Sequence, residues 1–147
     1  MTIGDLGIVR SVSIAADGQV QVVLTPTYSG CPATEVIRGD VVAALKHAGF
    51  DDVVVRTALA PAWTTDWITA TGRRKLAAHG IVPPAPAPLP RRVEVALTTR
   101  LATEVQVQCP RCESADTRLV SQFGATACQA MYRCVACREP FDRIKPY

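Results

Sequence analysis

The sequence lacks the motifs of several large classes of enzyme. It contains no Gly-x-Gly-x-x-Gly fingerprint and no phosphate-binding loop, so no nucleotide site is indicated. The two histidines, His47 and His79, belong to no Glu-x-x-His motif, which argues against a carboxylate-bridged di-iron site. No Ser/His/Asp or Cys/His arrangement for nucleophilic catalysis is recognisable either. These absences argue against nucleotide-dependent, di-iron and nucleophilic catalysis by this chain.

Long apolar runs and a secretion signal are missing too. No run approaches the roughly 18 apolar residues that span a bilayer, and residues 1–15 lack a basic start followed by an apolar stretch. Six cysteines without a targeting segment therefore indicate the reducing cytoplasm. The formal net charge is only +3, which is weak for a nucleic-acid surface.

The strongest positive signal is a pair of Cys-x-x-Cys motifs, Cys109-Pro-Arg-Cys112 and Cys134-Val-Ala-Cys137. Two residues between the cysteines of a pair let both thiolates of a tight turn reach one ion, and two such turns fill the tetrahedral shell of structural zinc. We therefore predict a zinc ribbon with Cys109, Cys112, Cys134 and Cys137 as ligands. A disulfide pair, a redox motif and an iron centre are the weaker alternatives.

The residues between and after the knuckles fit the strands of such a ribbon. Strands are expected over 117–123, 128–133 and 141–144. Cys128 lies six residues before Cys134, about 20 Å away at ~3.3 Å per residue of extended chain. We therefore interpret Cys128 as a small, buried apolar residue and not as a fifth ligand. Zinc would supply most of the ribbon's stability, on the order of 10 kcal/mol.

The first half of the chain predicts a small ββαβα domain, so that the fold class is α+β. An Asp17-Gly18 turn joins two strands, and a helix ends at Gly49. The second strand has Val20, Val22 and Leu24 on one face and is expected to be half-buried. The expected ranges are strands over 7–14 and 20–24, a helix over 34–48, a strand over 52–59 and a short helix over 68–78. Arg73, Arg74 and Lys75 of the short helix are interpreted as a solvated face.

Cys31 is expected at the entrance to the first helix. It follows Gly30 and precedes Pro32, a residue that suits the first turn of a helix. Unpaired amides and the helix dipole at that place favour the thiolate, which suits a reactive thiol or a soft-metal ligand. The alternative is that Cys31 only begins a core helix.

A proline-rich stretch separates the two parts of the chain. Residues 82–90 contain five prolines, which indicates an extended linker. We therefore expect a first domain over 1–81, a linker over 82–92 and the ribbon domain over 93–147. The alternating stretches 93–97 and 104–108 are expected to extend the ribbon sheet.

Several of these stretches resemble known proteins. Asp5-Leu6-Gly7, and Thr27 with Gly30-Cys31-Pro32, are similar to the SufT-like iron–sulfur assembly domain. Further stretches, together with both knuckles, resemble the PaaD family, the D component of the phenylacetyl-CoA 1,2-epoxidase system of bacterial phenylacetate degradation. They are 63–68, 72–76, 80–84, 123–128 and 132–141. One departure is that only four residues precede Asp5, where the family has an Asp-Pro-Glu-Ile-Pro segment and a helix.

The resemblance implies an accessory protein that is not itself an enzyme. It implies help in maturing an iron–sulfur cluster or metal centre of the oxygenase system, with Cys31 as a reactive thiol or transient iron–sulfur ligand. Asp5 and Thr27 would support that site. The implied partners are the other components of the epoxidase system, above all the iron–sulfur reductase, with no role for a membrane and little for nucleic acid. A homodimer is left open.

Three other functions compete with that interpretation. The chain could be a structural subunit of the oxygenase complex in which Cys31 is incidental. Zinc ribbons often bind nucleic acid, although only Phe123 and Tyr132 offer stacking surface here. A thiol oxidoreductase is the weakest alternative, because Cys31 has no resolving cysteine in a Cys-x-x-Cys motif.

Overall fold

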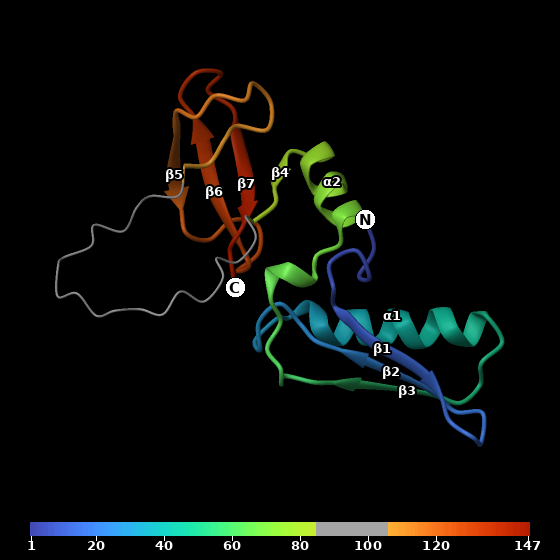
Figure 1. The fold of residues 1–147 in the computed structure, drawn as a ribbon. Coiled ribbons are helices and arrows are strands. Elements are labelled where there is room, and N and C mark those ends of the chain that lie inside the picture. The colour runs from blue at the N-terminus through green and yellow to red at the C-terminus, as the bar shows by residue number, and fades with distance from the viewer. Residues whose placement is uncertain (85–105) are drawn as a thin grey trace. The chain divides into compact units, whose positions relative to one another are not determined.

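The computed structural model describes residues 1–84 and 106–147, which form two compact units (Figure 1). The first unit is Met1–Lys75 with Tyr147, and the second is Leu76–Pro146. The expected strand over 93–97 and most of the proline-rich linker lie outside the described residues. No helix within the described ranges combines the length and the apolar character that crossing a membrane would require.

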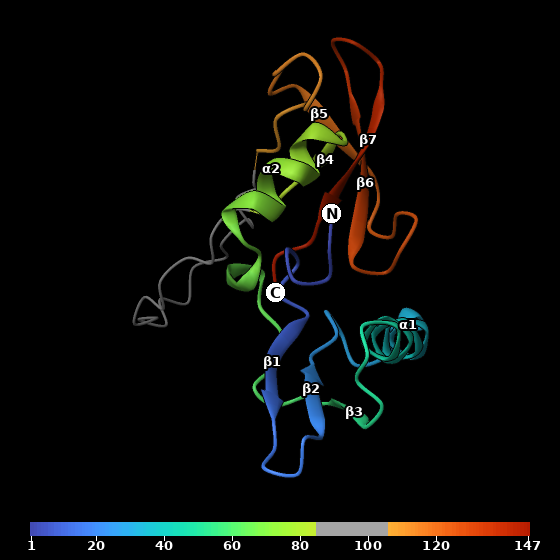
Figure 2. The same cartoon turned by 90° about the vertical axis from the view of Figure 1, so that its right-hand side faces the viewer.

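A three-stranded sheet covered by one helix forms the body of the first unit (Figures 1 and 2). Its strands are β1 (Val9–Ile14), β2 (Val20–Leu24) and β3 (Val53–Thr57), in the order β1-β2-β3. The β1–β2 pair is antiparallel, while β2 and β3 are parallel. A parallel pair needs a long crossover. That crossover contains α1 (Ala33–His47), and the ββαβα order expected from the sequence is confirmed.

Alternation along β2 places the core where the sequence predicts it. Val20, Val22 and Leu24 are 2%, 2% and 1% exposed, and they pack with Ile8 and Val55. The helix α1 closes this cluster with half-buried apolar residues at helical spacing, namely Ile37, Val41, Val42 and Leu45. Each fully buried aliphatic side chain contributes roughly 1.5–3 kcal/mol.

The segment after β3 contains two helical pieces in place of the single expected helix over 68–78. A 3-10 turn, η1 (Thr65–Trp67), precedes α2 (Ala70–Ala78). Two threonines explain the division, because each accepts a hydrogen bond at a helix start. The Thr64 hydroxyl accepts from the Asp66 amide at 3.1 Å, and the Thr69 hydroxyl accepts from the Gly72 amide at 2.9 Å.

The N-terminal turn, residues 2–7, packs against η1 and the start of α2. The indole of Trp63 donates to the Leu6 carbonyl at 3.0 Å, and the Thr69 amide donates to the Asp5 carbonyl at 3.0 Å. The backbone of this turn lies so close to η1 and α2 that glycine is required at two positions. A Cβ on Gly7, whose φ is 67°, would overlap Trp67, and a Cβ on Gly72 would overlap the Asp5 carbonyl.

A four-stranded sheet in the order β4-β7-β6-β5 forms the second unit. The strands are β4 (Ile81–Val82), β5 (Thr117–Ser121), β6 (Gln129–Cys134) and β7 (Pro140–Ile144). The last three correspond to the expected ribbon strands. Residues 106–108 form no strand, although one was expected over 104–108.

The pairing of β4 changes the division of the chain. Ile81 and Val82 pair in parallel with Asp142 and Arg143, although the sequence assigns residue 81 to the first domain and 82 to the linker. The two compact units accordingly divide between Lys75 and Leu76. The linker range itself stays a prediction.

Two helical glycines allow a matched test of the N-terminal turn. We expect Gly72→Ala to destabilise the protein by about 1–3 kcal/mol, because its methyl group would overlap the backbone of Asp5. Gly39→Ala in α1, where nothing lies within 4 Å of the added carbon, should stabilise by about 0.5–1 kcal/mol. Urea unfolding followed by circular dichroism checks both changes. Equal effects of the two substitutions would contradict the packing described here.

Candidate metal centre

Each Cys-x-x-Cys motif folds into the same type of turn. The Cys109 amide donates to the Ser114 carbonyl at 2.9 Å, and the Cys134 amide donates to the Glu139 carbonyl at 3.0 Å, five residues on in both cases. The residue after the second cysteine of each motif adopts a positive φ, 59° at Glu113 and 64° at Arg138. This repeated geometry turns both cysteines of a motif toward the same point.

The two turns bring all four thiols together, as the spacing predicts. The sulfur of Cys109 is 3.7 Å from that of Cys137, and the sulfur of Cys112 is 3.5 Å from that of Cys134. All four lie within 4.8 Å of one another. A tetrahedron with zinc–sulfur bonds of about 2.3 Å has edges of about 3.8 Å. The four thiols therefore fit a structural zinc ion.

Hydrogen bonds and burial shift the pKa values of Cys134 and Cys112 in opposite directions. The amide of Cys137 donates to the sulfur of Cys134 and lowers the pKa of Cys134 to about 7, against the effect of burial. A backbone hydrogen bond from Ser114 lowers the pKa of Cys112, but hydrogen bonding with Cys134 and burial outweigh it and raise that pKa to about 12. Zinc binding must displace the remaining protons, so the affinity falls as the pH falls.

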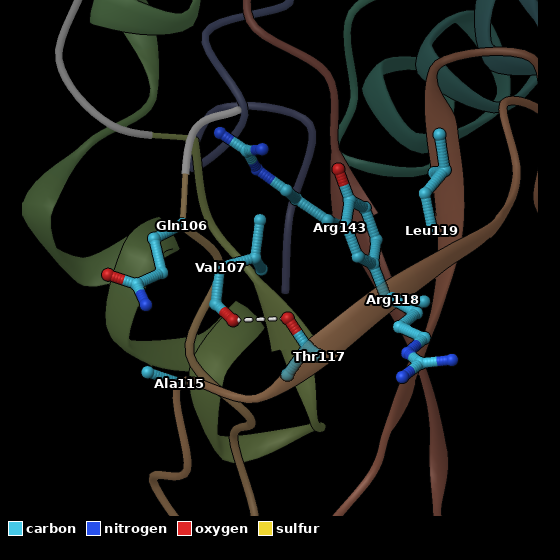
Figure 3. A pocket seen from close by; sticks show the side chains of 8 residues that line it. Gln106, Val107, Ala115, Thr117, Arg118, Leu119 and Arg143 are labelled. Atoms are coloured by element: carbon cyan, nitrogen blue, oxygen red, sulfur yellow. Dashed lines mark hydrogen bonds between the residues drawn. The ribbon is translucent and has the colours of Figure 1, made fainter. Parts of the chain in front are cut away.

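The ribbon core supports the buried half of this cluster. Cys109 and Cys134 are 1% and 0% exposed and pack with Val107 and Phe141. The Thr117 hydroxyl donates to the Val107 carbonyl at 2.6 Å, which joins β5 to the segment that leads into the first knuckle (Figure 3). Thr117 and Val107 line one side of an open hollow of about 840 Å³ over the sheet. The knuckle is thus fixed by the sheet as well as by its own turn.

Cys128 lies outside the four-thiol cluster. Its sulfur is 3.1 Å from the Thr126 hydroxyl, and the residue is half-buried. Its carbonyl accepts from the Lys145 amide at 3.0 Å. The described structure therefore gives Cys128 a local hydrogen bond and no place among the metal-binding thiols.

Cys31 is half-buried immediately before α1. Its amide donates to the Tyr28 carbonyl at 3.2 Å, and its carbonyl accepts from the Thr34 amide at 3.1 Å. The residue lines a small apolar hollow together with Ile8, Leu24 and Thr27, and it also lines a larger open hollow of about 680 Å³. We call these two spaces the Cys31 hollow. Thr27 and Cys31, which the sequence grouped together, thus meet at one place.

Arg38 and Arg56 flank the open part of the Cys31 hollow, which sequence reasoning did not anticipate. Arg38 is bound to Glu35, one turn earlier on α1, at 2.9 Å. The two arginines come from α1 and from β3, so no local motif connects them. Glu35 lines the same hollow and offsets the charge of Arg38, so the net positive charge there corresponds to one arginine.

Asp5 is held at a different part of the first unit. Its carboxylate is 12% exposed and accepts from the Lys75 ammonium at 2.6 Å and from the Thr2 amide at 2.9 Å. Neither partner lines the Cys31 hollow. Lys75, interpreted from the sequence as part of a solvated face, therefore pairs with Asp5 and fixes the N-terminal turn to α2.

Known proteins resemble both units. The family model of the PaaD zinc beta ribbon domain matches residues 94–145, and that of the iron-sulfur cluster assembly protein matches residues 1–56. A protein of Escherichia coli (strain K12), described as the putative D component of 1,2-phenylacetyl-CoA epoxidase, is 48% identical over 145 residues, which cover 99% of this chain and 81% of the relative. The chain belongs to the PaaD family. The resemblance seen in its sequence is thereby confirmed.

The first unit also has similar solved structures. The crystal structure of a domain of unknown function, DUF59, from Bacillus anthracis covers 49% of this chain and 70% of that one, at a TM-score of 0.47 and 23% identity.

Substitution of single cysteines tests the zinc site of this PaaD-family protein. We expect one zinc per chain by elemental analysis, with Cys134→Ser losing the zinc and the fold of the ribbon, because zinc binding contributes on the order of 10 kcal/mol to such modules. Cys128→Ser is the matched control and should retain one zinc, since its thiol lies outside the cluster. Zinc retained by Cys134→Ser and lost by Cys128→Ser would contradict the assignment.

The ion pair of Asp5 makes a prediction about pH. Hydrogen bonds from Lys75, then from Thr2, lower the pKa of Asp5 from 3.8 to about 2. A carboxyl whose pKa is lower in the folded state stabilises the fold above the unfolded value, and this contribution is lost as the pH falls toward the folded value. Carboxyl carbon shifts measured by NMR should therefore titrate near pH 2, and Lys75→Met should return them toward 3.8. Titration near 3.8 in the unsubstituted protein would contradict the pairing.

Proposed function

We propose that this chain is a non-catalytic accessory component of a phenylacetyl-CoA epoxidase system, and that it helps to mature an iron–sulfur cluster or metal centre of a partner protein. The observation that carries the proposal is the position of Cys31. It lies at an open hollow, outside the zinc cluster, within the stretch that matches the iron-sulfur cluster assembly family. The name of the Escherichia coli relative supplies the epoxidase system.

A single accessible thiol suits a transient ligand better than a resident one. One thiolate from Cys31 would hold iron or a cluster at one coordination position and leave the others for the client's own thiolates. Transfer is then a ligand exchange, in which a client thiolate replaces the Cys31 thiolate at the iron and Cys31 regains a proton. This step requires no change of oxidation state. The client that we propose is the iron–sulfur reductase of the system, in the cytoplasm.

The surroundings of Cys31 support such an exchange. Thr27 lines the small apolar hollow with the thiol, and we propose that it supports the thiolate. Arg56 beside the open hollow would favour a negatively charged thiolate cluster, whereas Arg38 is already paired with Glu35. The contribution of Asp5 is indirect, because it fixes the N-terminal turn that leads to Ile8, a residue of the same hollow. A homodimer is not needed for this scheme.

The substitution Cys31→Ser tests the transfer role. We expect this variant to keep its fold and its zinc, and to leave the co-expressed reductase deficient in iron and acid-labile sulfide by several-fold. Its matched control is Cys128→Ser, which removes another half-buried thiol and should leave the cluster content of the reductase unchanged. Both variants are compared after purification without oxygen.

Two outcomes would overturn the proposal. If Cys31→Ser supports a reductase with its full cluster content, Cys31 has no role in transfer. Stable co-purification of that variant with the oxygenase proteins at fixed stoichiometry would then favour a structural role in the complex.

A further inference from the structure

Three arginines gather on the exposed side of the ribbon. The register places Arg118 of β5 directly across from Arg133 of β6, and the guanidinium of Arg133 donates to the carbonyl of Arg138 at 3.2 Å. All three residues are exposed. Like charges directly opposite one another in an antiparallel pair reduce its stability. The ribbon therefore carries an unfavourable pair at its surface.

No acidic side chain of the described residues neutralises this pair. None of the ion pairs seen among residues 1–84 and 106–147 includes Arg118, Arg133 or Arg138. Asp142 is the acidic residue across β6, opposite Met131, and its carboxylate lies against Gly124. Within the described residues, the positive charge of the three arginines is therefore not neutralised, and it is available to an acidic group of a binding partner.

Aliphatic side chains lie among the arginines. Leu119, Val120 and Val135 are 49%, 58% and 40% exposed. Together with Arg118, Arg133 and Arg138 they line an open groove of about 510 Å³, which we call the arginine–aliphatic groove. Figure 3 shows the Thr117 hydroxyl directed toward Val107 and the side chain of its neighbour Arg118 extending away from Val107. Arg118 and Leu119 lie between this groove and the hollow beside Val107, because they line both.

We propose that the arginine–aliphatic groove binds an acidic, extended segment of a partner protein. Carboxylates of that segment would pair with the guanidinium groups, which match a carboxylate with two parallel hydrogen bonds. Its aliphatic side chains would cover Leu119, Val120 and Val135. The unfavourable Arg118–Arg133 pair is then relieved on binding. This inference does not depend on a role of Cys31 in metal transfer.

The lining of the groove favours a peptide over a nucleic acid. Binding of single-stranded nucleic acid relies on aromatic side chains that stack on bases. The groove is lined by arginine, aliphatic and cysteine residues without an aromatic ring. Residues 106–147 contain six Lys/Arg against four Asp/Glu, a difference of only two charges. Carboxylates interspersed with aliphatic residues fit this composition better than a continuous phosphate backbone.

Reversing the charge of Arg118 separates its contribution to peptide binding from its effect on the stability of the ribbon. The probe is a set of fluorescent decapeptides in which Glu or Asp alternates with Val, Ile or Leu, measured by anisotropy with the full zinc-loaded chain. Arg118→Glu should weaken binding at least tenfold, and it should raise the thermal midpoint because it places opposite charges across from each other. Arg111→Glu makes the same charge change on an exposed residue outside the groove and should alter binding less than twofold.

Three outcomes would overturn the inference. If no peptide of the set binds more tightly than its Lys-containing counterpart, the groove does not recognise acidic segments. If Arg118→Glu and Arg111→Glu weaken binding equally, the effect is one of net charge. If oligothymidylate binds more tightly than the peptides and loses that affinity in Arg118→Glu, the groove is a nucleic-acid site. Zinc content is measured for every variant, so that loss of the ribbon fold is detected.

Discussion

Convergence of four thiols on one point is the constraint on which the ribbon depends. Among the described residues, the sheet of the second unit has four short strands, and its core contains two of the cysteines themselves, Cys109 and Cys134. So little apolar burial cannot stabilise a fold on its own. An ion held at this point therefore acts as the centre of the core, and the strands position the ligands more than they supply stability.

The first unit differs from the ribbon, because the apolar cluster that forms its core contains no cysteine. Its apolar cluster is complete without Cys31, which lies at the border of that cluster and of an open hollow. The N-terminal turn matters here through its packing. Asp5 and Gly72 fix it against α2, and the chain then continues directly into Ile8 beside the thiol. A thiol at an open hollow on a firmly packed support would suit the transient ligand that we propose for Cys31.

The parts predictable from the sequence are those with local signals. Two residues between cysteines determine a turn, so the four-thiol cluster could be predicted, and alternation at Val20, Val22 and Leu24 located the first core. The pairing of Lys75 with Asp5 was not predicted, because the two residues are seventy positions apart and the sequence around neither of them indicates its partner. β4 was missed for a similar reason. It has only two residues, beside a run of prolines, and its pairing with β7 is known only from the folded structure. The groove on β5 depends on register, which the sequence of a single strand does not specify.

The position of β4 bears on how such a protein could have been assembled from parts. The ribbon sheet takes one strand from before the proline-rich stretch and three from after it. If a gene fusion had been made at the prolines, the segment after them would have supplied a sheet without its edge strand β4. The segment before them would have supplied that strand. The residues after the prolines therefore do not contain the whole ribbon sheet of this chain, and an exchange between relatives should preserve the sheet only if the crossover falls ahead of residue 81.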